Sequence, residues 1–391
     1  MTLIMSRFLF AGFMILATAC SAGTAPQGRL AADVRSTTSE SPAQSSAAGP
    51  TAYYYSAAVV EARPSETGQA PSATGPQPAM AGPTPLATDD AAGPFASPSP
   101  RFSASAAYDG ATGDTVLFGG ETFANGDFTF LSDTWIWKGR HWTQVTPAHS
   151  PSARASAQMA YDPLHRQVVL FGGMAGDRLT DTWLWNGSDW TQAAPAHSPV
   201  GTIEEGMTFF SGTRTVLMYS SGDQMVNMGN HVYSWDGSDW TDLPFSGGPP
   251  LSAFQGGLSA DPVRGVVVLL AFDYNQAALQ HWEFDGTTWT HRDVSTPPTR
   301  SLVQTLTDER DHTIVLFGGT GVNDTWTWDG TRWTQQHPRH APSVRSSTGP
   351  MPSMAYDAMR GEVVIFGGIE YTTNVPLNDT WTWNGGDWHS R

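Results

Sequence analysis

The sequence predicts an all-β fold, a six-bladed β-propeller of four-stranded antiparallel blades, and three observations carry the prediction. A segment with two aromatic residues around a Gly-containing turn recurs six times, at intervals of 44 to 55 residues, and all 16 tryptophans lie in these segments. A period near fifty residues, built from strand-like segments, is typical of propellers and related repeat arrays. No stretch of residues 101–391 has the length and the 3.6-residue apolar period of a helix.

Each repeat contains four extended segments. In the second repeat they are residues 156–162, 167–173, 181–185 and 189–192, which are rich in Val, Leu, Phe, Trp and Thr and are separated by Gly, Pro, Asn and Asp. This pattern is typical of short strands. The last two segments are joined by Asn186-Gly187, a pair that readily adopts the positive φ values of a tight hairpin turn.

The tryptophans have a structural explanation. One four-stranded sheet leaves both of its faces uncovered, whereas six sheets packed face to face around an axis bury them. We therefore expect the Trp that stands five residues after the first aromatic of each repeat to wedge between blades. These structural residues are Trp142, Trp190, Trp240, Trp289, Trp333 and Trp388.

The six repeats are complete and in phase. The ring is therefore expected to close by simple packing of the last blade on the first, with no strand exchanged between them. The strand-like run at residues 52–62 could add to an outer edge. The predicted blades cover about residues 99–147, 148–197, 198–245, 246–295, 296–338 and 339–391.

Four repeats carry Gly-Gly at the end of their second strand, before the aromatic strand and the outer Trp. The pairs are Gly119-Gly120, Gly172-Gly173, Gly318-Gly319 and Gly367-Gly368. In this order of features, residues 101–391 resemble the kelch repeat. The resemblance implies a six-bladed kelch-type propeller, as also found in the central domain of galactose oxidase-like proteins. Kelch propellers mostly bind partners, so the resemblance implies binding rather than a particular chemistry.

Repeats three and four depart from this pattern in two ways. They have Ser220-Ser221 and Ala271-Phe272 near the Gly-Gly position, and His231 and Gln280 where the other repeats have Asp. Because the two features are lost together, we hypothesise that the Asp carboxylate accepts hydrogen bonds from backbone N–H groups of the Gly-rich turn. The aspartates with this structural role would be Asp133, Asp181, Asp324 and Asp379.

The N-terminus resembles an export signal. Arg7 precedes the apolar run 8–17, and Ala17-Thr18-Ala19 forms a small-residue cleavage site, so residues 1–19 are predicted to be a signal peptide. Cys20 follows directly and resembles the acylated cysteine of a bacterial lipobox. We therefore expect an exported lipoprotein, anchored in a membrane at the cell surface or in the periplasm. Ordinary cleavage after Ala19, which would give a secreted protein, remains the alternative.

Residues 20–98 are dominated by Ala, Pro, Ser, Thr and Gly. Such a segment buries too little apolar surface to offset its ordering entropy, so it is predicted to be a disordered tether. A flexible chain of roughly 80 residues has an end-to-end distance on the order of 50 Å. The propeller, residues 99–391, would then stand clear of the membrane as a single domain.

Charge and composition argue against several classes of function. The chain has 20 Lys and Arg against 36 Asp and Glu, a formal net charge of −16, which disfavours nucleic acids and anionic lipids as partners. Cys20 is the only cysteine, so the propeller cannot form the Cys–Tyr copper centre of galactose oxidase-like proteins. Gly-x-Ser-x-Gly, His-Glu-x-x-His and phosphate-loop motifs are absent from the sequence. We therefore predict no catalytic residue, no cofactor and no metal site.

The histidines between repeats do not change this prediction. His149, His197, His337 and His340 recur beside prolines at different blade junctions, and one metal site would require them to converge. They are therefore interpreted as repeat residues.

The long segments between the second and third strands are the candidate binding face. They span 121–132, 222–231, 273–280 and 369–378, and kelch topology implies that they share one face with the loops between blades. Exposed aromatic and Met side chains beside polar residues suit a protein partner or a glycan. The candidate residues are Phe123, Phe128, Met225, Met228, Tyr274 and Tyr371. One alternative is that Phe128 and Phe130 fold inward and only anchor their own loop.

A second candidate is the acidic pair Glu204-Glu205. Arg101, Arg154, Arg300 and Arg345 stand near the start of four repeats, and an acidic pair facing such a ring could bind a cation or a polar ligand. Internal ion pairs are the alternative. The two glutamates are poor candidates for a glycosidase pair, because adjacent strand residues point to opposite faces.

The sequence thus predicts a monomeric, non-catalytic binding scaffold that recognises a protein partner at the cell surface. A glycan-binding propeller is the alternative, and a glycan-active or other hydrolytic enzyme is a third.

Overall fold

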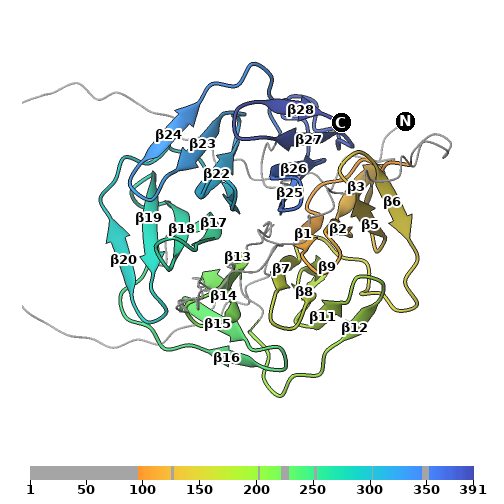
Figure 1. Cartoon of the computed structure of the whole chain (residues 1–391), viewed down its shortest axis with the longest axis horizontal. Coiled ribbons are helices and arrows are strands. Elements are labelled where there is room, and N and C mark those ends of the chain that lie inside the picture. The colour runs from red at the N-terminus through yellow and green to blue at the C-terminus, as the bar shows by residue number, and fades with distance from the viewer. Residues whose placement is uncertain are drawn as a thin grey trace, which may run out of the picture. The chain divides into compact units, whose positions relative to one another are not determined.

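The computed structural model describes residues 96–391 except 125–126, 201–202, 222–228, 251–252, 302 and 346–351. Within these residues the chain forms six four-stranded sheets and two two-stranded sheets, with no helix. The six larger sheets are arranged as blades around an axis (Figure 1). The predicted all-β, six-bladed propeller is therefore confirmed. The signal peptide, Cys20 and the run 52–62 lie outside the described residues.

The strands follow one another blade by blade. Blade 1 contains β1 (Ser105–Asp109), β2 (Asp114–Phe118), β5 (Thr134–Trp137) and β6 (Trp142–Val145). Blade 2 contains β7 (Gln158–Asp162), β8 (Gln167–Phe171), β11 (Thr182–Trp185) and β12 (Trp190–Gln192). Blade 3 contains β13 (Ile203–Phe210), β14 (Thr215–Ser221), β15 (His231–Trp235) and β16 (Trp240–Asp242).

The second half of the ring repeats this order. Blade 4 contains β17 (Ala253–Asp261), β18 (Val266–Asp273), β19 (Ala278–Phe284) and β20 (Trp289–Arg292). Blade 5 contains β21 (Gln304–Asp308), β22 (Thr313–Phe317), β23 (Thr325–Trp328) and β24 (Trp333–Gln336). Blade 6 contains β25 (Ser353–Asp357), β26 (Glu362–Phe366), β27 (Thr380–Trp383) and β28 (Trp388–Ser390). The small sheets are β3 (Glu121–Ala124) with β4 (Asp127–Phe130), and β9 (Met174–Ala175) with β10 (Asp177–Arg178).

In every blade the four strands pair in chain order, and all of the pairs are antiparallel. Blade 6 therefore takes its four strands from the last repeat, and no strand is exchanged when the ring closes. Blades 6 and 1 lie side by side in Figure 1. They are joined by hydrogen bonds from the Arg101 amide to the Leu377 carbonyl (2.9 Å) and from the Ser353 hydroxyl to the Ala104 carbonyl (2.7 Å).

The Gly of the turn between the third and fourth strands is needed twice over. Gly187 has a φ of 96°, in the left-handed region that favours glycine. A Cβ at this position would lie 2.7 Å from the Thr112 side chain of blade 1. The Asn186 side-chain oxygen accepts the backbone N–H groups of Ser188 and Asp189 and closes the turn. The turn thus brings each blade into contact with the one before it.

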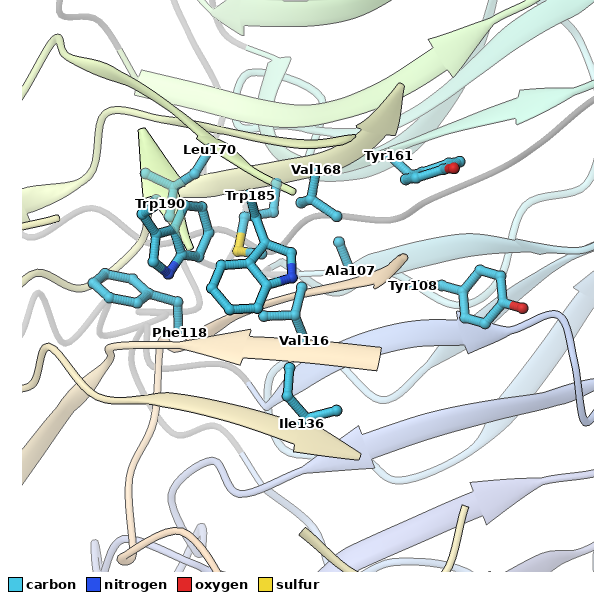
Figure 2. Close-up of a cluster of buried hydrophobic side chains, with 12 residues drawn as sticks. Ala107, Tyr108, Val116, Phe118, Ile136, Tyr161, Val168, Leu170, Trp185 and Trp190 are labelled. Atoms are coloured by element: carbon cyan, nitrogen blue, oxygen red, sulfur yellow. The ribbon is translucent and has the colours of Figure 1, made fainter. Parts of the chain in front are cut away.

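The core lies between neighbouring sheets. Figure 2 shows the cluster between blades 1 and 2, in which Phe118 meets Trp190 edge to face with ring centroids 5.4 Å apart. Trp185 packs on Trp190 at 5.2 Å. Both tryptophans are fully buried, and replacing such a side chain by Ala typically costs about 3–5 kcal/mol.

Five of the six outer tryptophans also donate a hydrogen bond to the third strand of the preceding blade. The indole N–H of Trp289 has no partner among the described residues, because the residue at the acceptor position of blade 3 is Val232. The indole donors and their acceptors are Trp142 with Thr380, Trp190 with Thr134, Trp240 with Thr182, Trp333 with His281 and Trp388 with Thr325.

Candidate functional site

The segment 121–132, expected as a loop, forms the hairpin β3–β4. Phe123 pairs with Phe128 across the two strands, and their ring centroids are 5.0 Å apart. Their side chains are 41% and 59% exposed. Phe128 also stands edge to face on the buried Phe102, at 6.4 Å. The hairpin therefore holds two aromatic rings in solvent, while Phe130 is partly buried.

The base of this hairpin is held on both sides. The backbones of Phe102 and Glu121 exchange two hydrogen bonds, of 3.0 and 2.9 Å. The Leu131 amide donates to the Gly120 carbonyl, and the Arg154 amide of blade 2 donates to the Leu131 carbonyl. Glu121 itself is only 8% exposed, and burial raises the pKa of its carboxyl to about 7. The aromatic pair thus stands on a hairpin whose base is held by backbone hydrogen bonds. This base contains the buried Glu121 carboxyl, which can bind a proton near neutral pH.

The other candidate residues lie in different sectors of the ring. Tyr274 of blade 4 is exposed and packs edge to face on Phe272, with centroids 4.6 Å apart. Tyr371 of blade 6 is exposed and lies against Gly321 of blade 5. Half of the segment 273–280 is strand, because β18 extends to Asp273 and β19 begins at Ala278, with a turn between them.

The structure therefore brings Phe123 and Phe128 together, and the other two aromatics stand apart from them. Met225 and Met228 lie outside the described residues, as do the side chains of Glu204 and Glu205.

The four arginines at the starts of repeats form internal ion pairs. The Arg101 guanidinium donates to both carboxylate oxygens of Asp133, at 2.6 and 2.8 Å, and to the Gly119 carbonyl at 3.0 Å. The Trp135 indole donates to the same carboxylate at 2.6 Å. Burial opposes ionisation of Asp133, but the Arg101 bonds outweigh it and hold its pKa below the usual value. The equivalent pairs are Arg154–Asp181, Arg300–Asp324 and Arg345–Asp379.

This arrangement corrects the expected role of the aspartates. The Gly-rich turn does not donate to the carboxylate, because the Gly119 amide donates to the Asp133 main-chain carbonyl at 3.1 Å. In each of the four blades that have both features, one arginine binds the Asp carboxylate and the carbonyl of the first Gly at once. The arginines near the start of the same four repeats were expected to form either a ligand-binding ring or internal ion pairs, and the structure shows the ion pairs, with the aspartates as their partners.

Blades 3 and 4 have longer inner strands in place of this ion pair. Their first strands, β13 and β17, have 8 and 9 residues, against 5 in the other four blades. Each has a register shift, between Glu204 and Gly206 and between Phe254 and Gly257. In blade 4, Gln280 takes over part of the role of the Asp, since its side-chain oxygen accepts the Trp282 indole N–H at 2.9 Å.

The junction histidines bind aspartates of the next blade. His149 approaches Asp189 with its backbone N–H at 2.8 Å and its Nδ1 at 2.9 Å. His197–Asp239 and His340–Asp387 repeat this geometry, and His337 is exposed. Within residues 96–391, leaving out the masked gaps, no group of three or more His, Cys, Asp or Glu side chains could hold a metal ion. The same residues contain no helix long and apolar enough to span a membrane.

A hollow of about 360 Å³ opens at the outer edge of blade 3. Sequence reasoning missed it, although one signal was present: the third repeat has Tyr233 where the others have Trp. The lining residues are His197, Ser198, Val200, Tyr233, Trp240, Thr241 and Asp242.

Comparisons with known proteins support the fold. No protein-family model matches the chain, and no curated protein matches it. Among solved structures, the structure of YjhT is 12% identical, covers 75% of this chain and 98% of its own, and superposes with a TM-score of 0.53. A mutant of the Aleuria aurantia lectin AAL in complex with Fucalpha1-6GlcNAc is 14% identical, with coverages of 75% and 96% and a TM-score of 0.48. At these identities the likeness to YjhT extends to the propeller fold alone.

Proposed function

We propose that this chain is a non-catalytic scaffold whose hairpin β3–β4 recognises a protein partner. The observation that carries the proposal is the pair Phe123 and Phe128, two exposed aromatic rings in contact with each other on a paired hairpin. Aromatic side chains dominate the energetic centres of protein interfaces. Because the strands are already paired, little further ordering is needed on binding.

The propeller of this proposal is of the kelch type, and two observations support that assignment. Four blades end their second strand in Gly-Gly with both φ values positive, as for Gly119 and Gly120 at 65° and 94°. Each blade also buries an outer Trp. The scaffold would be exported as a monomer and anchored through an acylated Cys20, with residues 20–98 as its tether.

Glycan binding is the second candidate function, and the exposed tyrosines favour it. Tyr274 and Tyr371 stand beside exposed polar residues such as Asn275 and Gln276. Aromatic faces beside amide groups suit the apolar face and the hydroxyls of a sugar ring. A hydrolytic activity has no comparable support among the described residues.

A capture experiment tests the protein-binding proposal. The full-length chain and its Phe123→Ser/Phe128→Ser variant would be used to capture partners from cell-surface extracts, followed by titration of the purified partner. We expect capture by the wild type and binding at least about tenfold weaker by the variant. Val263→Ser, which removes an exposed apolar side chain from the turn between β17 and β18, is the matched control. Equal affinity of all three proteins for the partner, or no capture by any, would refute the proposal.

A further inference from the structure

The hollow on blade 3 lies away from the hairpin β3–β4 and has its own construction. Its lining comes from the linker that follows β12, through His197, Ser198 and Val200, and from strands β15 and β16. A volume of about 360 Å³ is at the lower end of the range for small-ligand pockets. A ligand that fills it would be a small molecule or one unit of a polymer.

The hollow adjoins a position at which blade 3 differs from the other five blades. In the other five blades a Trp occupies the position of Tyr233, and its indole N–H is bound by an Asp or Gln two residues earlier. In blade 3 that earlier residue is His231, which binds Asp242 of β16 at 2.8 Å. The imidazole stacks on Tyr233 with centroids 5.4 Å apart and planes 13° apart. A phenol ring is smaller than an indole, and Tyr233 lines the hollow.

Polar groups converge on this space. Tyr233 is 4% exposed, and its hydroxyl oxygen accepts the Val200 amide at 3.4 Å, which leaves the O–H to donate. Burial, together with the Asp242 carboxylate, raises the pKa of Tyr233, so this hydroxyl keeps its proton. Asp242 is exposed and binds His231 through Oδ2, which leaves Oδ1 as an acceptor. Ser198 and Thr241 add two hydroxyls.

The remaining lining limits the class of ligand. Val200, which is exposed, and the ring of Trp240 supply apolar surface. Among the described residues, no Lys or Arg lines the hollow, and Asp242 carries negative charge into it, so an anionic ligand is disfavoured. Oδ2 of Asp242 already contacts His231 Nδ1, which leaves one carboxylate oxygen, whereas a bound cation takes several oxygen ligands. A neutral ligand with several hydroxyls and one apolar face satisfies all of these groups.

We propose that this hollow binds one neutral sugar ring, with Asp242 accepting from ring hydroxyls, the Tyr233 hydroxyl donating and Val200 covering the apolar face. The site is independent of the proposed protein-binding hairpin, because no residue is common to the two. A scaffold with such a site would contact saccharides at the outer edge of blade 3 and a protein at the hairpin β3–β4.

Saturation-transfer NMR on the full-length chain tests the proposal, with glucose, galactose, mannose, N-acetylglucosamine and fucose as probes. We expect saturable binding of at least one of them. Tyr233→Trp restores the residue of the other blades, so it should keep the fold and weaken binding about tenfold or more by filling the hollow. Asp242→Asn, which keeps the size but removes the charge, should weaken binding several-fold.

Gln192→Asn is the matched control, because Gln192 pairs with Trp183 in blade 2 as Asp242 pairs with Tyr233 in blade 3. It should bind like the wild type. Absence of binding for all five sugars would overturn the proposal. Unchanged binding by Asp242→Asn, or by a folded Tyr233→Trp variant, would overturn it equally.

Discussion

The indole nitrogen of Trp142 lies 2.9 Å from the Thr380 hydroxyl, and this hydrogen bond joins the first blade to the last. The same donor meets a Thr of the preceding blade at three other junctions, for example Trp190 with Thr134 at 3.1 Å. The ring is therefore closed by a contact that also holds its interior junctions. Closure needs no exchanged strand, because the seam between blades 6 and 1 is built like its neighbours.

Replacing Thr380 by Val tests this bond. The substitution keeps the side-chain shape but leaves the buried Trp142 N–H without an acceptor, which typically costs about 1–3 kcal/mol. We expect a corresponding fall in the free energy of unfolding, measured by urea denaturation. Thr143→Val, at an exposed position of β6, is the control and should change little. A Thr380→Val protein as stable as the wild type would show that the bond contributes nothing to closure.

At blade 3 an acceptor can be added instead of removed, because Val232 occupies the position that the acceptor Thr has in other blades. The buried Trp289 N–H has no partner among the described residues. Val232→Thr should supply the missing acceptor and stabilise the protein by about 0.5–1.5 kcal/mol. Thermal unfolding of the two proteins measures the change. A lower melting temperature would mean that the new hydroxyl fails to reach the indole.

Removal of an Asp from a buried ion pair should lower the free energy of unfolding more than the loss of one Trp–Thr hydrogen bond does. Asp181→Ala leaves the fully buried Arg154 guanidinium without its carboxylate, and breaking such a pair typically costs about 3–5 kcal/mol. Asp177→Ala, at an exposed position of the same blade, is the control. Urea unfolding of both variants measures the two free energies of unfolding. Equal values for Asp181→Ala and Asp177→Ala would show that the buried ion pair does not stabilise the fold.

The same pair predicts sensitivity to acid. Burial opposes ionisation of Asp181, but its Arg154 and Trp183 bonds hold its pKa below the usual value. A depressed pKa contributes stability above the unfolded-state pKa of 3.8, and this stability is lost as the pH falls through the folded-state pKa. Between pH 5 and pH 3, Asp181→Ala should therefore lose less stability than the wild type.

Glu121 predicts a pH dependence of the opposite sign. Burial raises its pKa from 4.5 to about 7, so the folded protein binds a proton more tightly than the unfolded chain does. Its contribution is therefore complete below pH 4.5 and declines as the pH rises to 7, by a total on the order of 3 kcal/mol. Glu121→Gln should abolish this decline in urea titrations at pH 5 and pH 8. Asp127→Asn, an exposed change in the same hairpin, should retain it, and a decline retained by both would exclude Glu121 as its source.

Much of the fold could be predicted because the same sequence pattern occurs in all six blades. The turn at Asn186-Gly187 and the Trp five residues after Trp185 specify the outer hairpin of a blade by local rules. The hairpin β3–β4 was predictable in the same way. Its Asn125-Gly126 pair is flanked by Phe123 and Phe128, although the segment was interpreted as a loop.

The polar contacts were harder to predict because they join residues distant in the sequence. Arg101 binds Asp133 across 32 residues, and no local pattern shows that its guanidinium also reaches the Gly119 carbonyl. The hollow beside Tyr233 is harder still. It lies beside a Tyr that stands in the place of a Trp, and whether a smaller ring leaves a hollow depends on how neighbours such as Val200 pack against it.

The seam between blades 6 and 1 is built like the junction between blades 1 and 2, so the fold does not require the chain to begin at blade 1. Just ahead of blade 1, the Ser97 hydroxyl donates to the Asn378 carbonyl of blade 6, so the chain that leads into the first blade already rests on the last one. A peptide joining β28 to the segment before β1, with new ends opened between blades 3 and 4, would preserve every contact at the seam, including the Trp142–Thr380 bond. The chain could therefore begin at a different blade and still form the same folded ring.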